Sequence, residues 1–157
     1  MRVTTWMRRA VLAAAVTATG GVAGAPHGVA VAADAPPGRA DEKAKPVDPT
    51  RTFKGAVADE ALAAKAPADH VVADAKAWDA IRDAWALPDG AKDVDFAKQV
   101  VLVGTTRGSV INGRPTLTDA GDLRVAFVST RDLRPGFRYL ALVVPRDGVK
   151  TVNGKPL

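Results

Sequence analysis

A helical pattern of large hydrophobic residues stands in the middle of the chain. Trp78, Ile81 and Trp85 recur at the i, i+3 and i+7 positions of one helix face. Asp74 has the side chain of a helix N-cap, and a Leu-Pro-Asp-Gly segment ends the pattern after Ala86. We therefore expect an amphipathic helix from Asp74 to about Ala86 that buries its tryptophans. Two alanines, Ala77 and Ala84, would widen this face. Four polar residues would face water: Lys76, Asp79, Arg82 and Asp83.

Short runs of β-branched and aliphatic residues predict strands on both sides of this helix. Val100–Val103 is a continuous aliphatic run, which is typical of a strand covered on both faces. Leu123, Val125 and Phe127 alternate with polar or smaller residues, as in a half-buried strand. Glu60–Ala66 fits a short helix or an irregular connection. The other predicted strands are Thr52–Val57, Val71–Val72, Phe137–Val144 as a central strand, and Gly148–Val152.

Asparagine, glycine and proline positions predict how the strands connect. Asn112-Gly113 tolerates the positive φ angles of a type I′ turn, so we expect a hairpin there. Pro115 removes a ladder hydrogen bond, which places the second arm of that hairpin at a sheet edge. We expect a turn at Thr118–Asp122 and a loop at Arg131–Gly136.

One helix followed by about five strands predicts an α+β fold that is mainly β. The amphipathic helix would pack on an antiparallel sheet or partial barrel. Residues 51–157 are enough for one small hydrophobic core and too few for two domains. Residues 33–50 contain four prolines and a single large aliphatic residue, so we expect a disordered tether before this domain.

Residues 1–32 have the pattern of a signal peptide. Basic residues precede an apolar stretch of small residues, and Ala30-Val31-Ala32 offers a signal-peptidase site. We therefore expect cleavage near Ala32 and an exported mature protein, periplasmic or extracellular, with no transmembrane anchor. The general secretory route is favoured, and the Arg8-Arg9 pair leaves twin-arginine export as the alternative.

The charge of the mature chain gives no reason to expect nucleic acid as a partner. Three of the 22 basic residues and none of the 17 acidic residues lie in residues 1–32, so the net charge falls from +5 to about +2 after cleavage. Bases and acids are also interspersed along the rest of the chain. We therefore expect no nucleic acid as a partner.

No group of side chains has the spacing of a catalytic or metal site. The chain has no cysteine, and His70 is the one histidine after the signal, which excludes thiolate and multi-histidine metal sites. Ser109 and Ser129 lack the pattern of a nucleophile elbow. Asp95 is expected to cap a short turn through Ala97-Lys98. We therefore predict that the protein is not an enzyme and has no cofactor.

Five arginines gather in the β-rich half of the chain and form the predicted partner surface. An exposed cluster of guanidinium groups could form an anion-binding or protein-binding surface, and a solvated charged surface is the alternative. These arginines are Arg107, Arg114, Arg131, Arg134 and Arg138.

The order of several short motifs resembles the PrcB-like domain of secreted bacterial accessory proteins. These motifs are Trp78-x6-Trp85, Leu87-Pro88, Val94-Asp95-Phe96, and Val100–Val103 followed by Gly104. Gly136-Phe137-x-Tyr139 and the ending from Gly148 to Lys155 are similar to a group of small uncharacterised exported bacterial proteins. The resemblance covers roughly Val71–Leu157. The chain departs from the family pattern after Gly104, because it has Arg107–Arg114 where the pattern has a Gly-Gly-Tyr type of segment. It implies a subunit that stabilises a protease complex, and it implies no catalytic residues.

These observations predict an exported, non-enzymatic accessory domain that binds and stabilises a partner protein. A small-molecule or glycan-binding module of the cell envelope is the alternative, and a deep apolar pocket with a few convergent polar groups would favour it. A hydrolase that uses Asp93 and Asp95 is a third hypothesis.

Overall fold

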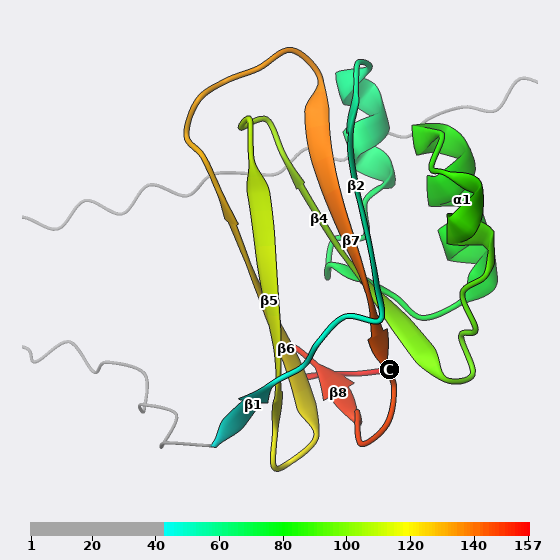
Figure 1. The fold of residues 1–157 in the computed structure, drawn as a ribbon, viewed down its shortest axis with the longest axis vertical. Coiled ribbons are helices and arrows are strands. Elements are labelled where there is room, and N and C mark those ends of the chain that lie inside the picture. Colours follow the sequence, from blue (N-terminus) through cyan, green and yellow to red (C-terminus); the bar gives the residue numbers. More distant parts are fainter. Residues whose placement is uncertain (1–42) are drawn as a thin grey trace, which may run out of the picture. The chain divides into compact units, whose positions relative to one another are not determined.

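The computed structural model describes residues 43–157, which form a helical layer and two β-sheets (Figure 1). Helix α1 (Ala75–Trp85) packs on one face of a four-stranded sheet, and a five-stranded sheet packs on the other face. Two short 3-10 helices lie before and after α1, η1 (Glu60–Lys65) and η2 (Asp89–Lys92). The predicted fold class, a mainly β α+β fold with one amphipathic helix on an antiparallel sheet, is confirmed.

The four-stranded sheet is antiparallel throughout and carries most of the buried residues. Its strands lie in the order β2 (Arg51–Val57), β7 (Phe137–Pro145), β4 (Gln99–Thr106) and β3 (Val71–Val72). The predicted run Val100–Val103 is fully buried because its side chains alternate between the helix side and the second sheet. The prediction that Phe137–Val144 is a central strand is also confirmed, since β7 lies between β2 and β4.

The five-stranded sheet is mixed and is built from shorter strands. Its order is β1 (Ala44–Pro46), β5 (Ile111–Thr118), β6 (Asp122–Ser129), β8 (Thr151–Val152) and β9 (Lys155–Pro156). The β6–β8 pair is parallel and the other pairs are antiparallel. The predicted turn at Thr118–Asp122 joins β5 to β6, and the predicted loop at Arg131–Gly136 joins β6 to β7.

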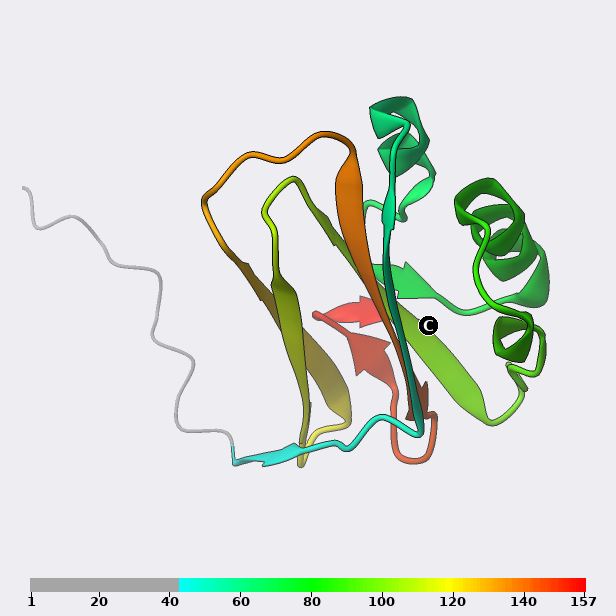
Figure 2. The ribbon, with the colours of Figure 1, turned by 45° about the horizontal axis from the view of Figure 1, so that its top comes forward.

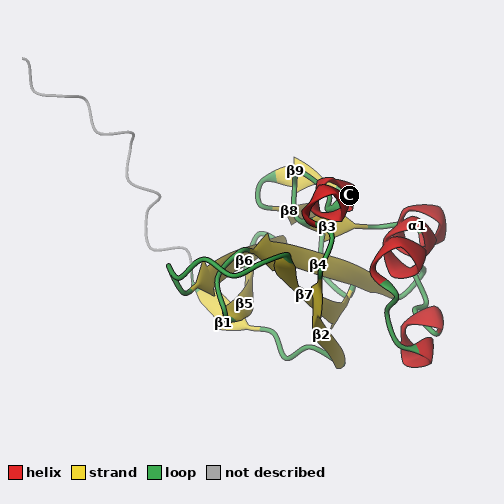
Figure 3. Ribbon diagram, turned by 90° about the horizontal axis from the view of Figure 1, so that it is seen from above, coloured by secondary structure: helices red, strands yellow, loops and turns green. Residues whose placement is uncertain are grey.

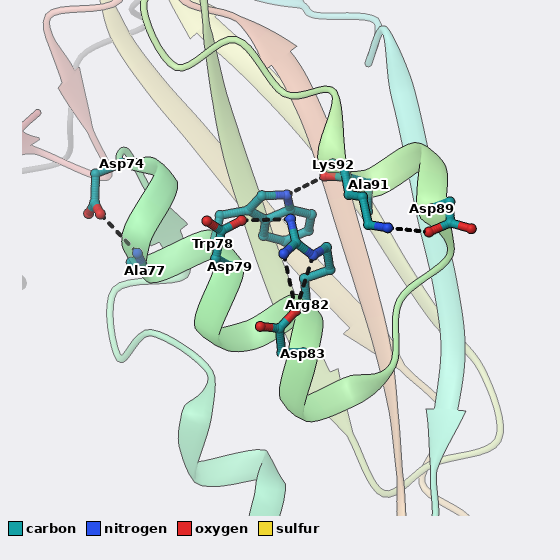
Figure 4. A network of polar contacts seen from close by, with 9 residues as sticks. All are labelled: Asp74, Ala77, Trp78, Asp79, Arg82, Asp83, Asp89, Ala91 and Lys92. Atoms are coloured by element: carbon teal, nitrogen blue, oxygen red, sulfur yellow. Dashed lines mark hydrogen bonds and ion pairs between the residues drawn. The ribbon is translucent and has the colours of Figure 1, made fainter.

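Tryptophans anchor α1 to the four-stranded sheet, as the sequence predicts. Trp78, Ile81 and Trp85 are all buried. The Trp78 Nε1–H donates to the carbonyl oxygen of Ala91 at 2.7 Å (Figure 4), and the Trp85 Nε1–H donates to that of Leu62 at 2.9 Å. Both indole donors are therefore satisfied, so the rings bury their apolar area without an unpaired polar atom.

Two details of the helix differ from the sequence expectation. Asp74 caps the helix by accepting the Ala77 N–H at 2.9 Å, so Ala77 lies in the first turn and is exposed instead of widening the buried face. Arg82 is half-buried rather than fully solvated, because its guanidinium donates to Asp79 and Asp83 and lies along the helix (Figure 4). These ion pairs hold its aliphatic stem against the protein surface.

The predicted hairpin at Asn112-Gly113 is wrong, because both residues lie inside the continuous strand β5. Gly113 stands opposite Phe127, and a Cβ atom at position 113 would lie 2.9 Å from the ring. The glycine therefore makes room for an aromatic ring and does not supply a turn. The second Asn-Gly pair makes the turn instead: Asn153 and Gly154 have φ angles of 50° and 81° between β8 and β9.

The last part of the predicted tether is ordered, which corrects the expectation for residues 33–50. Ala44–Pro46 forms β1 and pairs with Thr116–Thr118 of β5. Residues 47–50 then cross from one sheet to the other (Figure 2), with backbone hydrogen bonds from Val47 to Pro115 and from Thr50 to Val143. The predicted signal peptide, residues 1–32, and residues 33–42 lie outside the described residues.

A candidate binding cleft between two strand edges

A cleft of about 610 Å³ opens between β2 of the four-stranded sheet and β5 of the five-stranded sheet. Figure 3 shows β2 and the β1–β5 pair on the same side of the sheets. The cleft is lined by Pro49, Thr52, Lys54, Gly55, Ala56, Ser109, Val110, Ile111, Asn112, Gly113, Arg138, Tyr139, Leu140 and Leu142. The crossing segment 47–50 contributes Pro49 at one end, and the loop between β4 and β5 contributes Ser109 and Val110.

Strand register explains which side chains line the cleft. Thr52, Lys54 and Ala56 of β2 pair with Leu142, Leu140 and Arg138 of β7, so all six share the face that looks toward the five-stranded sheet. The two leucines form the apolar floor and are 5% and 3% exposed. The three β2 residues are exposed, because the five-stranded sheet does not extend over them.

Both walls of the cleft are strand edges. Among residues 43–157, no strand pairs with the outer edge of β2, which ends the four-stranded sheet. On β5, the short strand β1 covers only Thr116–Thr118, so Ile111–Arg114 also lack a neighbouring strand on that side in the part of the chain that the structure describes. The backbone N–H and C=O groups along such edges can pair with another extended chain.

A glycine–tyrosine contact holds the middle of β2 close to the sheet. On the helix side of β2, the Tyr139 ring lies over Gly55, where a Cβ atom would be 2.7 Å from the Tyr139 hydroxyl oxygen. Burial of this ring raises the pKa of the Tyr139 hydroxyl, so it stays neutral at physiological pH. The contact fixes the edge of β2 without placing a charge on that face.

The charge of the cleft is positive. Lys54 and Arg138 line it, and no Asp or Glu is found among the lining residues that the structure describes. One Arg138 Nη1–H donates to the carbonyl oxygen of Pro135 at 3.0 Å, and neither cation forms an ion pair with another described residue. An anionic group would therefore find two cations without carboxylate partners near an apolar floor.

The rim of the cleft is built by two loops that are bound to each other. Asp132 accepts hydrogen bonds from the Ser109 N–H at 3.0 Å and from the Arg134 Nε–H at 3.0 Å. A hydrogen bond from Thr130, together with the Ser109 and Arg134 bonds, holds the pKa of Asp132 far below its usual range. The carboxylate therefore stays charged and ties the loops together across the physiological pH range. Two large apolar side chains are left at these loops, Val110 with 48% and Leu133 with 75% of its surface exposed.

The structure brings four of the five predicted arginines to this end of the molecule. Arg107 pairs with Glu60 at 3.2 Å, and its carbonyl oxygen accepts the Arg134 N–H. Arg131 is exposed in the same loop, and Arg138 lies in the cleft. Arg114 lies apart, because it follows the inward-facing Gly113 and so points from the outer face of the five-stranded sheet. The five residues therefore do not form one continuous surface.

The other candidate residues have structural contacts. The Asp95 carboxylate accepts the Ala97 N–H at 3.0 Å, which confirms the predicted cap. The His70 Nδ1 lies 3.0 Å from the Val103 carbonyl oxygen, and its ring packs on Phe127. Ser109 belongs to the rim, where its hydroxyl bonds to Asp132.

The described residues contain neither a metal-binding cluster nor a membrane-spanning helix. Residues 43–157 contain no group of three or more His, Cys, Asp or Glu placed to hold a metal ion. Over the same range, no helix is long and apolar enough to cross a membrane. Lys54, which belongs to none of the predicted sites, contributes a positive charge to the cleft from the middle of β2. The alternation of Thr52, Lys54 and Ala56 could have shown their common face, but not that this face borders an open cleft.

Comparison with known proteins adds no relative. No known protein family matches the chain, and no curated protein or solved structure matches it significantly. The resemblance to the PrcB-like domain therefore stays a prediction.

Proposed function

We propose that the protein is an exported, non-enzymatic binding domain that holds a partner protein at the cleft between β2 and β5. The observation that carries this proposal is the pair of free strand edges that border one cleft with an apolar floor. Free edges usually invite aggregation, and proteins cover or charge them unless they are used. Export rests on the predicted signal peptide, and the PrcB-like resemblance implies the same class of partner.

The exposed rim supports a partner larger than a small molecule. Val110 lines the cleft and Leu133 lies in the loop whose Asp132 is bonded to Ser109, and both side chains have about half or more of their surfaces in water. Apolar side chains gathered beside a polar, positively charged groove are typical of a protein interaction site. A partner that covers this rim would bury both side chains as well as the cleft.

A small-molecule or glycan-binding module is the second candidate, and the size of the cleft favours it. Ligand pockets usually measure about 300–1,000 Å³, and the cleft falls within that range. Its open sides and strand edges favour the protein partner, because a ligand pocket usually encloses most of the ligand surface.

Site-specific photo-crosslinking tests the proposed function. A photo-reactive amino acid at Ala56, which is exposed in the cleft, should give a discrete protein adduct in the exported fraction of the producing cells. The matched control is the same amino acid at Ala77, which is exposed on α1. No adduct from Ala56, or the same adduct from both positions, would refute a partner-binding cleft. A small ligand retained by the native protein in mass spectrometry would support the second candidate instead.

A further inference from the structure

Among residues 43–157 no strand pairs with the outer edge of β2, so this edge is available for one more strand. β2 is seven residues long, ends the four-stranded sheet, and has its cleft-facing side chains in water. An extended peptide can add to such an edge through main-chain hydrogen bonds, while alternate side chains enter the neighbouring groove. The facing segment 111–114 of β5 offers a second edge on the opposite wall of the cleft.

We propose that the cleft receives an extended segment of the partner as an additional strand on β2, and that this segment places an acidic side chain beside Lys54. The inference rests on the proposed function and names the part of the partner that is recognised. The ligand is a peptide segment with alternating side chains, one set of which faces the cleft. Apolar residues on either side of the acid would lie near Ile111 and Ala56.

The positive charge of the cleft favours an acidic segment. Side chains directly opposite each other on antiparallel strands have Cβ atoms about 4.5–5.5 Å apart, so a carboxylate opposite Lys54 would lie within ion-pair reach. Arg138 lies on the same face, two residues along the register and one strand inward. A basic segment would meet these two cations, and no carboxylate among the described lining residues would offset the repulsion.

The same charges disfavour a second copy of this chain as the occupant. Lys54 is the charged residue on the cleft-facing side of β2, whereas Arg51 lies on the opposite face and donates to the carbonyl oxygens of Gly90 and Asp93. Antiparallel pairing of two β2 edges centred on Lys54 would place the two Lys54 side chains opposite each other, which destabilises a strand pair. The occupant is therefore a different chain with acidic residues.

Selection from a library of random decapeptides displayed on phage tests the inference on the full chain. We expect enriched peptides to share apolar–acidic alternation and to contain no proline within the alternating segment. A synthetic copy of an enriched peptide should lose measurable binding when alternate backbone nitrogens on its β2-facing edge are methylated. Methylation of the other set of alternate nitrogens should weaken binding less.

Two matched variants then test the role of Lys54. Lys54→Glu should lower the affinity for the acidic peptide by about tenfold, because an attractive cross-strand pair becomes a repulsive one. Lys76→Glu makes the same charge change at an exposed position on α1 and should leave the affinity unchanged. Selection on the Lys54→Glu variant should enrich basic residues instead of acidic ones. Both variants should unfold at the temperature of the wild type, since both lysines are exposed.

Three results would overturn the inference. The enriched peptides could show no preference for acids, they could bind Lys54→Glu as well as the wild type, or they could tolerate methylation of both sets of nitrogens. If Ala56 crosslinks to a partner that the acidic peptide does not displace, the strand-addition inference fails while the proposed function stands. If neither a crosslinked partner nor a cleft-dependent peptide is found, the proposed function fails as well.

Discussion

A methyl group at position 104 tests how the two sheets are held together behind the cleft. Gly104 lies on β4, and the Phe127 ring of β6 reaches across from the other sheet to cover it. A Cβ atom at position 104 would lie 2.5 Å from Phe127 Cδ1 and 2.6 Å from Cγ. Restoring an ordinary carbon contact of about 3.5 Å requires the ring to move by about 1 Å.

The expected cost follows from this overlap. Gly113 lies opposite Phe127 on β5, and the same ring already fills the space over it, so the ring cannot retreat freely. Added methyl groups in a packed core cost about 1–3 kcal/mol. The smaller conformational freedom of alanine in the unfolded chain offsets about 0.4–1 kcal/mol of this. We therefore expect Gly104→Ala to lower the free energy of unfolding by about 1–2 kcal/mol.

Chemical denaturation of a double-mutant cycle measures this cost and assigns it to the ring. In a Phe127→Leu background the planar ring is absent, so Gly104→Ala should cost much less than in the wild type. Gly90→Ala is the matched control, because a Cβ atom at that position would meet no atom within 4 Å. The packing argument is refuted if Gly104→Ala costs the same in both backgrounds, or if it is as harmless as Gly90→Ala.

Three further predictions concern the other parts of the fold. Trp85→Ala should lower the free energy of unfolding by about 3–5 kcal/mol, because it removes a buried ring and the donor to Leu62; an unchanged denaturation midpoint would show that the ring is not a core residue. Asp122→Asn should cost about 1.5–3 kcal/mol at pH 7, since the carboxylate accepts from Arg124, Thr151 and Gly154. Burial alone would raise the pKa of Asp122, but these hydrogen bonds outweigh burial and lower the pKa. The stabilisation by the carboxylate is therefore present above about pH 4 and should fade as the pH falls through the folded-state pKa. A difference in stability between Asp122→Asn and the wild type that persists in strong acid would contradict this. Asp95→Ala should cost about 0.5–2 kcal/mol and Asp95→Asn less, because an amide oxygen can still accept the capping N–H; equal, negligible shifts in thermal unfolding would contradict the cap.

The local parts of the fold could be predicted because their causes are local. The spacing of Trp78, Ile81 and Trp85 sets the buried face of α1, and Asp74 supplies its cap within three residues. The run Val100–Val103 predicted a strand buried on both sides, and both of its neighbouring layers are present. In each case a residue acts on neighbours that lie close to it in the sequence.

The two Asn-Gly pairs have different structures, which their local sequence does not predict. Asn153-Gly154 forms a turn with positive φ angles, whereas Asn112-Gly113 continues a strand. The difference comes from Phe127, fourteen residues after Gly113, whose ring needs a position without a side chain. A dipeptide preference of this kind is weak enough for a single half-buried aromatic ring to override it.

The candidate site could not be predicted from the sequence for a similar reason. The five arginines share only their place in one half of the sequence. In the structure Arg114 faces away from the others, and Arg107 and Arg134 are paired with acids. The cleft instead depends on how far β1 covers β5, and β1 is three residues long in a segment with the composition of a tether. Edge exposure is a property of strand order, which no local pattern encodes.

A lysine in the middle of an exposed edge strand has two physical consequences. Its charge opposes pairing with another β2 strand, which is how many proteins keep a free edge from aggregating. The same charge attracts an acidic strand, so Lys54 would exclude self-association and select the partner with a single side chain. The two consequences separate on substitution. Lys54→Gln should lower the affinity for the acidic peptide and raise the tendency to self-associate. Lys54→Glu should lower that affinity further, by about tenfold relative to the wild type, while still opposing self-association. Sedimentation of the two variants at high protein concentration measures their self-association. If Lys54→Gln self-associates no more than the wild type, Lys54 does not prevent self-association and only selects the partner.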